Sequence, residues 1–296
     1  MLKPNIPPKT QAHKGQHAQS APCPPTQQPC GQAGNASTSL APQEPCAKPR
    51  LALVGCHGRM GRLFMQRLAD AADICGIDMP LSPKKVQTAC ATADIVLLCV
   101  PAAAMQECLA LCVPHMRAGA LLADIVSVKE EPLAHMEKAW HGACVGTHPL
   151  FGPQPAPDLD LRVCLTPGAR AGANDIAVLK KLFASMGARC FCSTAQEHDR
   201  AVSIIQSMNF ITSLTYFAML ADRQDLKPFI TPSFVRRQEA ARKLLTEDGE
   251  LFTGLFEANP YAHESVRQYR ALLNIAAGGD IELLLHRAQR WLEQQK

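Results

Sequence analysis

Between residues 50 and 148 the chain alternates short apolar runs with segments whose apolar residues recur at helical spacing. The first run, LALVG over 51–55, leads into CHGRMG and then into RLFMQRLADA over 62–71. A short continuous apolar run is typical of a buried strand, and the periodic segment is typical of an amphipathic helix. The pattern therefore predicts a strand, a glycine-containing turn and a helix.

Four further apolar runs follow, over 74–80, 93–101, 120–127 and 143–148. We expect helices between them, around 103–116 and 130–140. Strands buried on both faces read as nearly unbroken apolar runs, and their alternation with helices is typical of a parallel sheet. We therefore predict an α/β fold in which residues 50–194 form one domain, a Rossmann-type doubly wound parallel sheet.

The back half contains an uncharged stretch, SIIQSMNFITSLTYFAML over 203–220. Its length is compatible with a membrane span, but polar residues interrupt it and Arg200 and Asp222 flank it, so we reject that interpretation. We predict instead a helix buried on nearly all sides, in a subunit interface or an all-helical second domain over 195–296. This second domain is expected to bind substrate and to form a homodimer.

The first 49 residues are rich in Pro, Gln, Ala and Ser and contain few large apolar residues. Such a segment does not bury enough apolar surface to offset the entropy of ordering, so we expect a disordered tail. It has no apolar core of a signal peptide and almost no arginine, which argues against a targeting segment.

Charge and cysteine content narrow the class of partner. The net charge is +4 and the basic residues are spread along the chain, so we expect a small-molecule substrate and no nucleic-acid or membrane partner. Most of the 13 cysteines lie in apolar runs. This is typical of reduced, buried thiols in a cytoplasmic protein, and no cysteine spacing predicts a metal site.

The turn after the first predicted strand is the first candidate for chemistry. Its glycines are Gly55, Gly58 and Gly61, and the lack of side chains lets backbone amides at a helix start approach a pyrophosphate. Arg59 and Met60 lie within the same turn. We expect all five residues to contact a dinucleotide cofactor, so residues 50–194 are predicted to be a dinucleotide-binding domain.

Asp78 lies at the end of the second predicted strand, 17 residues after Gly61. A carboxylate at this place accepts hydrogen bonds from the ribose hydroxyls and repels a 2′-phosphate, which favours NAD over NADP. The open alternative is a polar strand end without a ligand. Val100 and Pro101, at the end of the third run, are expected to contact the cofactor as well.

Ser127 and His148 end two further predicted strands. The carboxyl ends of parallel strands share one edge of the sheet, and ligands bind beyond that edge. Both side chains are therefore expected to face the cofactor crevice.

Four segments together resemble one family. VGCHGRMG, DIVSVK (124–129), GTHPLFGP (146–153) and EHDRAVSIIQ (197–206) are similar to the prephenate and arogenate dehydrogenases of tyrosine biosynthesis. The likeness covers about residues 50 to 290 and is strong to about residue 210. It implies NAD-dependent oxidative decarboxylation of prephenate to 4-hydroxyphenylpyruvate. Arogenate as the substrate, with tyrosine as the product, and a non-catalytic NAD-binding regulator remain open alternatives.

The resemblance also implies roles for single residues. His148 matches the catalytic histidine, and a neutral imidazole accepts the substrate hydroxyl proton near neutral pH. Ser127 matches a serine that contacts the same hydroxyl. Another NAD(P)-linked reductase would lack this Ser127 and His148 pair. Lys129 is expected either to place a positive charge near the substrate carboxylates or to be a solvated lysine at a helix start.

The E-H-D segment, 197–199, is interpreted through helix capping. An acid in the first turn of the helix that follows would complement the helix dipole. No catalytic role is assigned to His198.

The helix over 203–220 departs from the family pattern. Gln206 matches a family glutamine, but the histidine expected four residues later, which recognises the substrate side chain, is replaced by Phe210. Either Asn209 substitutes for it after a small shift, or the substrate side chain is held differently.

The family arginine that grips the ring carboxylate falls between two residues. Counting back from DGELF (248–252) without a gap gives Lys243, and a shift by one residue gives Arg242. Only a guanidinium forms the bidentate pair, so we expect Arg242 to bind the carboxylate. Arg236 and Arg237 on the same predicted helix are further candidates, or a solvated basic face.

Overall fold

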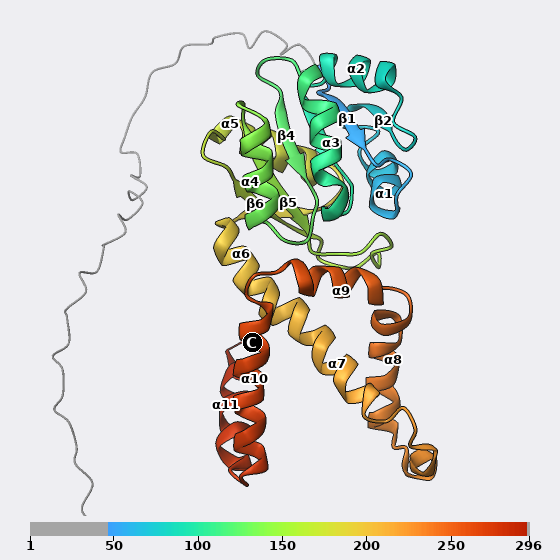
Figure 1. Cartoon of the computed structure of the whole chain (residues 1–296), viewed down its shortest axis with the longest axis vertical. Coiled ribbons are helices and arrows are strands. Elements are labelled where there is room, and N and C mark those ends of the chain that lie inside the picture. The colour runs from blue at the N-terminus through green and yellow to red at the C-terminus, as the bar shows by residue number, and fades with distance from the viewer. Residues whose placement is uncertain (1–46, 295–296) are drawn as a thin grey trace, which may run out of the picture. The chain divides into compact units, whose positions relative to one another are not determined.

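The computed structural model describes residues 47–294. Residues 1–46 of the predicted tail lie outside the described residues. A seven-stranded sheet with strand order β2-β1-β3-β4-β5-β6-β7 forms the first part of the chain (Figure 1). Its strands are β1 (Arg50–Val54), β2 (Asp73–Ile77), β3 (Ile95–Leu98), β4 (Leu121–Asp124), β5 (Cys144–Pro149), β6 (Arg162–Pro167) and β7 (Arg189–Cys192).

Strands β1 to β5 pair in parallel, which confirms the predicted α/β fold with a doubly wound sheet. The chain then reverses, because β6 runs antiparallel to β5, and β7 is parallel to β6. The carboxyl ends of β1 to β5 therefore lie along one edge of the sheet. In such a sheet this edge is where ligands bind.

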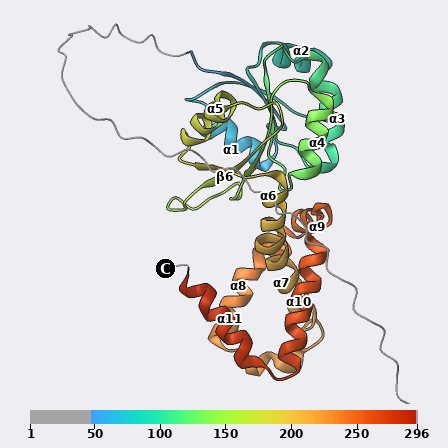
Figure 2. The same ribbon diagram turned by 90° about the vertical axis from the view of Figure 1, so that its left-hand side faces the viewer.

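Helices cover both faces of the sheet (Figure 2). Helices α1 (Arg59–Arg67) and α5 (Ala173–Ala184) pack on one face, and α2 (Pro83–Thr92), α3 (Met105–Cys112) and α4 (Glu130–Ala139) pack on the other. Successive side chains of a strand point to opposite faces. Leu51 and Leu53 accordingly join the core under α1 and α5, while Ala52 and Val54 join the core under α2, α3 and α4.

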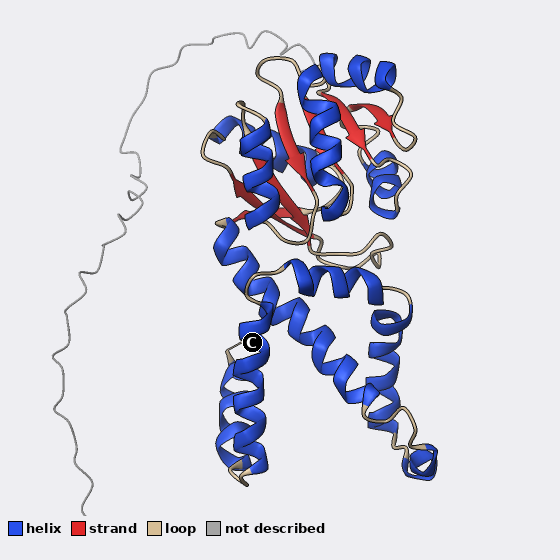
Figure 3. Ribbon diagram, viewed as in Figure 1, coloured by secondary structure: helices blue, strands red, loops and turns tan. Residues whose placement is uncertain are grey.

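The described residues beyond β7 form helices and connecting loops (Figure 3). A nearly continuous helical segment is made of α6 (Ala195–Val202), the π-helical turn η3 (Ser203–Ser207) and α7 (Met208–Ala218). The other helices are α8 (Pro232–Thr246), α9 (Gly249–Ala258), α10 (Ala262–Ala277) and α11 (Ile281–Glu293), and the short 3-10 turns of the chain are η1 (Ala102–Ala104), η2 (Val113–His115) and η4 (Gln224–Phe229).

The uncharged stretch 203–220 is helical as predicted, but it is not buried on nearly all sides within one chain. Ile204 and Ile205 are 59% and 66% exposed, and Met219 is 68% exposed. Among the described helices, none combines the length and the apolar character that a bilayer crossing requires.

Candidate functional site

The turn after β1 requires glycine at two positions. Gly55 has a φ of +84°, and a Cβ on it would lie 2.4 Å from the Cys99 carbonyl oxygen. A Cβ on Gly61 would lie 2.0 Å from the carbonyl oxygen of Gly55. The turn is fixed by the Gly55 N–H, which donates to the Ile77 carbonyl of β2 at 2.8 Å. Backbone therefore packs directly on backbone where the first three strands meet.

Helix α1 begins at Arg59 with Gly58 as its N-cap. Among the described residues, no side chain caps this end and no acidic residue lies in its first turn. The leading N–H groups and the positive end of the helix dipole thus remain available to an anion. The Arg59 guanidinium extends to Asp248, the N-cap of α9, with an Nη1–Oδ1 distance of 2.8 Å.

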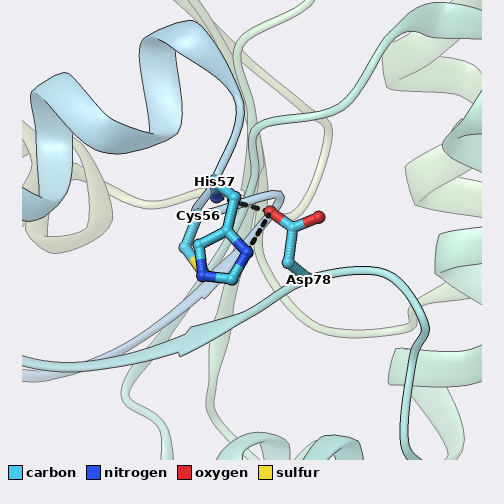
Figure 4. Close-up of side chains that lie close together, drawn as sticks. All are labelled: Cys56, His57 and Asp78. Atoms are coloured by element: carbon cyan, nitrogen blue, oxygen red, sulfur yellow. Dashed lines mark hydrogen bonds and ion pairs between the residues drawn. The ribbon is translucent and has the colours of Figure 1, made fainter.

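Asp78, just past β2, lies beside the glycine turn (Figure 4). Its Oδ2 accepts the His57 N–H at 2.5 Å and its Oδ1 accepts the Met79 N–H at 2.7 Å. The thiol of Cys56, the ring of His57 and the carboxylate lie within 4.8 Å of one another, a set of metal-ligand types. Burial and the Asp78 charge raise the pKa of the Cys56 thiol, which opposes the thiolate form that a metal binds.

The end of β3 contributes Val100, which is half-buried, and Pro101, which is exposed. Val100 Cγ1 is 3.2 Å from the place that a Cβ on Gly55 would take, so it lines the glycine turn. A pocket of about 350 Å³ lies between the segment that follows Pro101 and α4, and Ala102, Gln106, Val128, Glu131 and His135 are among its lining residues.

His148 lies in β5 and is 4% exposed. Its Nδ1 is 2.9 Å from Nε2 of His198, whose Nδ1 is 2.7 Å from Oδ1 of Asp199. Burial first, and then the neighbouring His198 and Lys129, lower the pKa of His148 well below its usual value. The imidazole of His148 is therefore neutral near pH 7, the form that accepts a proton.

Asp199 caps a helix that is distant in the sequence. Its two carboxylate oxygens accept the backbone N–H groups of Lys129 at 2.7 Å and Glu130 at 2.9 Å, at the start of α4. Its own carbonyl accepts a hydrogen bond from Asn259 Nδ2 at 2.8 Å. The expected capping of the following helix is confirmed for Glu197, which forms a capping box with Thr194, but Asp199 caps α4 instead.

Neither of the two roles expected for Lys129, a charge near the substrate carboxylates or a solvated lysine at a helix start, matches its surroundings. Its side chain and that of Asp124 are both 0% exposed, and Nζ lies 2.6 Å from Asp124 Oδ2. Nζ also donates to the Thr147 carbonyl at 2.9 Å. Burial raises the pKa of Asp124 and lowers that of Lys129, and their mutual attraction offsets part of each shift.

Ser127 is half-buried, three residues beyond β4, and thus follows the strand that pairs with the His148 strand. Gln206 is half-buried in η3, and Asn209 is exposed on α7. Phe210 is 3% exposed, and its ring stacks on Phe252 with the centroids 5.8 Å apart. An aromatic stack therefore fills the position of the family histidine.

Both candidate residues for the ring carboxylate are exposed on α8. Lys243 Nζ lies 3.8 Å from Oδ2 of Asp248, the same residue that binds Arg59 at the glycine turn. Successive residues of a helix point about 100° apart. Lys243 therefore lies on the side of α8 that faces Asp248, and Arg242 is rotated by about 100° from it around the helix axis.

Comparison with known proteins shows which proteins the chain resembles. The family described as "Prephenate dehydrogenase, nucleotide-binding domain" matches residues 65–192. The T-protein of Haemophilus influenzae is 26% identical over 210 residues, which cover 70% of this chain and 55% of that protein. The chain thus spans only slightly more than half the length of this curated relative.

Two solved structures share the fold. The arogenate dehydrogenase of Synechocystis aligns with a TM-score of 0.66 at 21% identity and covers 82% of this chain and 96% of its own. The prephenate dehydrogenase of A. aeolicus, solved in complex with hydroxyphenyl propionate and NAD+, aligns with a TM-score of 0.69 at 18% identity and covers 86% and 99%. Residues 65–192 therefore resemble the nucleotide-binding domain of the prephenate dehydrogenase family.

Proposed function

We propose that the protein catalyses the NAD-dependent oxidative decarboxylation of prephenate to 4-hydroxyphenylpyruvate. The observation that carries this proposal is a buried, neutral histidine, His148, on a strand whose carboxyl end shares one sheet edge with the glycine turn and Asp78. A histidine able to accept a hydroxyl proton at the edge where such sheets bind their ligands supports the proposal.

The residues around the turn fit NAD. The close backbone contacts of Gly55 and Gly61 and the uncapped start of α1 suit a pyrophosphate, and the Asp78 carboxylate suits an unphosphorylated ribose. Bound NAD supplies the hydride acceptor. The A. aeolicus relative, whose structure contains NAD+, supports this choice.

His148 handles the hydroxyl proton. As hydride leaves the carbinol carbon, the O–H bond breaks and the proton passes to the imidazole. Carbon dioxide then leaves the opposite ring position, the ring becomes aromatic, and the phenolate oxygen takes the proton back. No net proton is released, so the histidine is neutral again at the end of the cycle. Ser127 is proposed to contact the same hydroxyl and orient it.

The substrate carboxylates need cationic or polar partners. We propose Lys243 for the ring carboxylate in place of Arg242, which the sequence favoured and which remains the second candidate. The shared contact of Lys243 and Arg59 with Asp248 supports this choice. Phe210 offers no donor, so the substrate side chain is proposed to contact Gln206 and Asn209. This departure is the specific reason to retain arogenate as the alternative substrate.

A homodimer in the cytoplasm completes the proposal. Large apolar side chains are exposed along the helices of the back half, among them Ile205 at 66%, Phe229 at 77%, Trp291 at 57% and Leu292 at 59%. Exposed apolar surface of this extent favours association with a second copy. The ten cysteines in the described residues are all free thiols, in keeping with a reducing compartment.

The test uses the purified full chain with NAD and either prephenate or arogenate, and follows NADH by absorbance together with product identity by mass. We expect NADH to form in step with 4-hydroxyphenylpyruvate from prephenate. Turnover of arogenate alone would reassign the substrate. NAD binding without turnover of either compound would favour the regulator.

A further inference from the structure

Three buried side chains, those of Asp199, His198 and His148, form a chain of hydrogen bonds. The contacts of Asp199 determine which atom is the donor in each bond. The two oxygens of Asp199 accept the backbone N–H groups of Lys129 and Glu130 at 2.7 and 2.9 Å. A backbone N–H only donates, so both oxygens act as acceptors. The third contact of Asp199, with His198 Nδ1 at 2.7 Å, must therefore have its proton on the imidazole nitrogen.

The same reasoning continues to the next ring. A neutral imidazole has one N–H, so His198 with its proton on Nδ1 has only a lone pair at Nε2. That lone pair lies 2.9 Å from Nδ1 of His148, which must then be the donor. Nε2 of His148 is left without a proton.

We propose that Asp199 and His198 are positioning residues that hold His148 as its Nδ1-protonated tautomer, so that Nε2 accepts the substrate hydroxyl proton. This inference rests on the proposed dehydrogenase function and names the reacting atom of its base. The opposite tautomer would have an N–H at Nε2 and would be unable to accept.

The arrangement also offsets part of the cost that burial imposes on the charge created in this step. When the substrate O–H bond breaks and the Nε2–H bond forms, His148 becomes an imidazolium ion. Its Nδ1–H already donates to His198, and the Asp199 carboxylate lies at the far side of that ring. The three residues are 4%, 4% and 0% exposed, so little water screens this attraction.

The positioning residues come from the helical part of the chain, whereas His148 comes from the sheet. His198 and Asp199 lie on α6, and Asn259, just past α9, binds the Asp199 carbonyl. The start of α4 supplies the two N–H donors that fix the direction of the chain. The active tautomer thus depends on the junction between the sheet and the helices.

Two substitutions at one position separate this role from simple packing. His198→Gln places a carbonyl acceptor near His148 Nδ1 but loses the donor to Asp199, whereas His198→Leu loses both. We expect kcat of His198→Leu to fall on the order of 10²-fold, the lower end of what a general base contributes. The kcat of His198→Gln should fall by clearly less. In both variants the KM values for NAD and substrate should stay close to those of the wild type. The control is His141→Gln, an exposed histidine between α4 and β5.

A second readout does not depend on activity. In 15N-histidine-labelled full-length protein, the ring correlations of His148, assigned by their loss in His148→Asn, report which nitrogen bears the proton. We expect the proton on Nδ1 in the wild type and in His198→Gln, and a shift toward Nε2 in His198→Leu.

The two readouts decide the matter separately. A wild-type His148 with its proton on Nε2, or a His198→Leu variant with the kcat of His141→Gln, would overturn the inference. If His198→Leu does not fold, the wild-type spectrum and the His198→Gln variant still decide. A wild type that turns over neither prephenate nor arogenate removes the proposed function, and the spectrum then tests the tautomer alone.

Discussion

Replacing Lys129 by methionine would leave the Asp124 carboxylate buried without its cation. Both side chains are 0% exposed, and the ammonium contacts Asp124 Oδ2 at 2.6 Å and the Thr147 carbonyl at 2.9 Å. Asp124 Oδ2 would retain the Val126 N–H at 2.8 Å, while Oδ1 has no partner among the described residues even now. In the variant, the ionised form of Asp124 would therefore be strongly disfavoured in the folded protein.

Breaking one side of a buried ion pair costs about 3–5 kcal/mol. For a folded unit of this size, about 1 kcal/mol lowers Tm by about 2–4 °C, so we expect a fall of about 6–20 °C. The assay is thermal unfolding followed by circular dichroism, with Lys138→Met, an exposed lysine on the same helix, as the matched control.

A double variant tests the cause. Asp124→Asn together with Lys129→Met removes both charges, so it should lose much less stability than the sum of the two single variants. If Lys129→Met unfolds at the temperature of Lys138→Met and instead raises the KM for substrate, the ammonium faces the substrate and the reasoning from burial is refuted.

Further predictions concern the reaction itself. His148→Asn should lower kcat on the order of 10² to 10⁴-fold with little change in NAD affinity, and near-normal turnover would remove this residue from the mechanism. Because burial lowers the pKa of His148, the acid limb of the kcat/KM profile should have its midpoint below about pH 6.5. The contribution of this histidine to folding stability should be complete above that pH and should decrease as the pH falls below it. A midpoint above 6.5 would contradict this. Asp78→Ala should weaken NAD binding and reduce the preference for NAD over NADP. An unchanged preference would exclude Asp78 as the ribose ligand. Lys243→Ala should raise the substrate KM more than Arg242→Ala, and the reverse order would restore the arginine to the ring carboxylate.

The central sheet was predictable because strands buried on both faces are nearly all apolar. Strands β1, β3, β4 and β5 have this character, and in β3 and β4 every residue is buried. Strand β7 has no fully buried residue, and β6 follows a segment rich in proline and aspartate, so neither gives a clear pattern. The reversal between β5 and β6 could not be predicted either, because it follows from pairing between strands.

The candidate site likewise has features that the sequence predicts and features that it does not. The glycine turn, Asp78 and His148 stand at predictable strand ends, whereas the contact of Asp199 with Lys129 joins residues 70 positions apart. The E-H-D segment shows which residue types are present, but it does not show that the Asp199 carboxylate binds the start of α4. The buried lysine was also hidden, since charged side chains are almost never fully buried unless paired, and Asp124, five positions before it, was the available indication.

The most direct test of the account follows NADH formation by the wild type and by His148→Asn, with saturating NAD and prephenate or arogenate at neutral pH, with NAD binding measured on the same samples. We predict that both proteins bind NAD alike and that only the wild type forms NADH at an enzymatic rate, in equal amount with the aromatic 4-hydroxyphenyl product. Equal rates for the two proteins, or no NADH from either despite NAD binding, would contradict the assignment of His148 as the base of a prephenate or arogenate dehydrogenase.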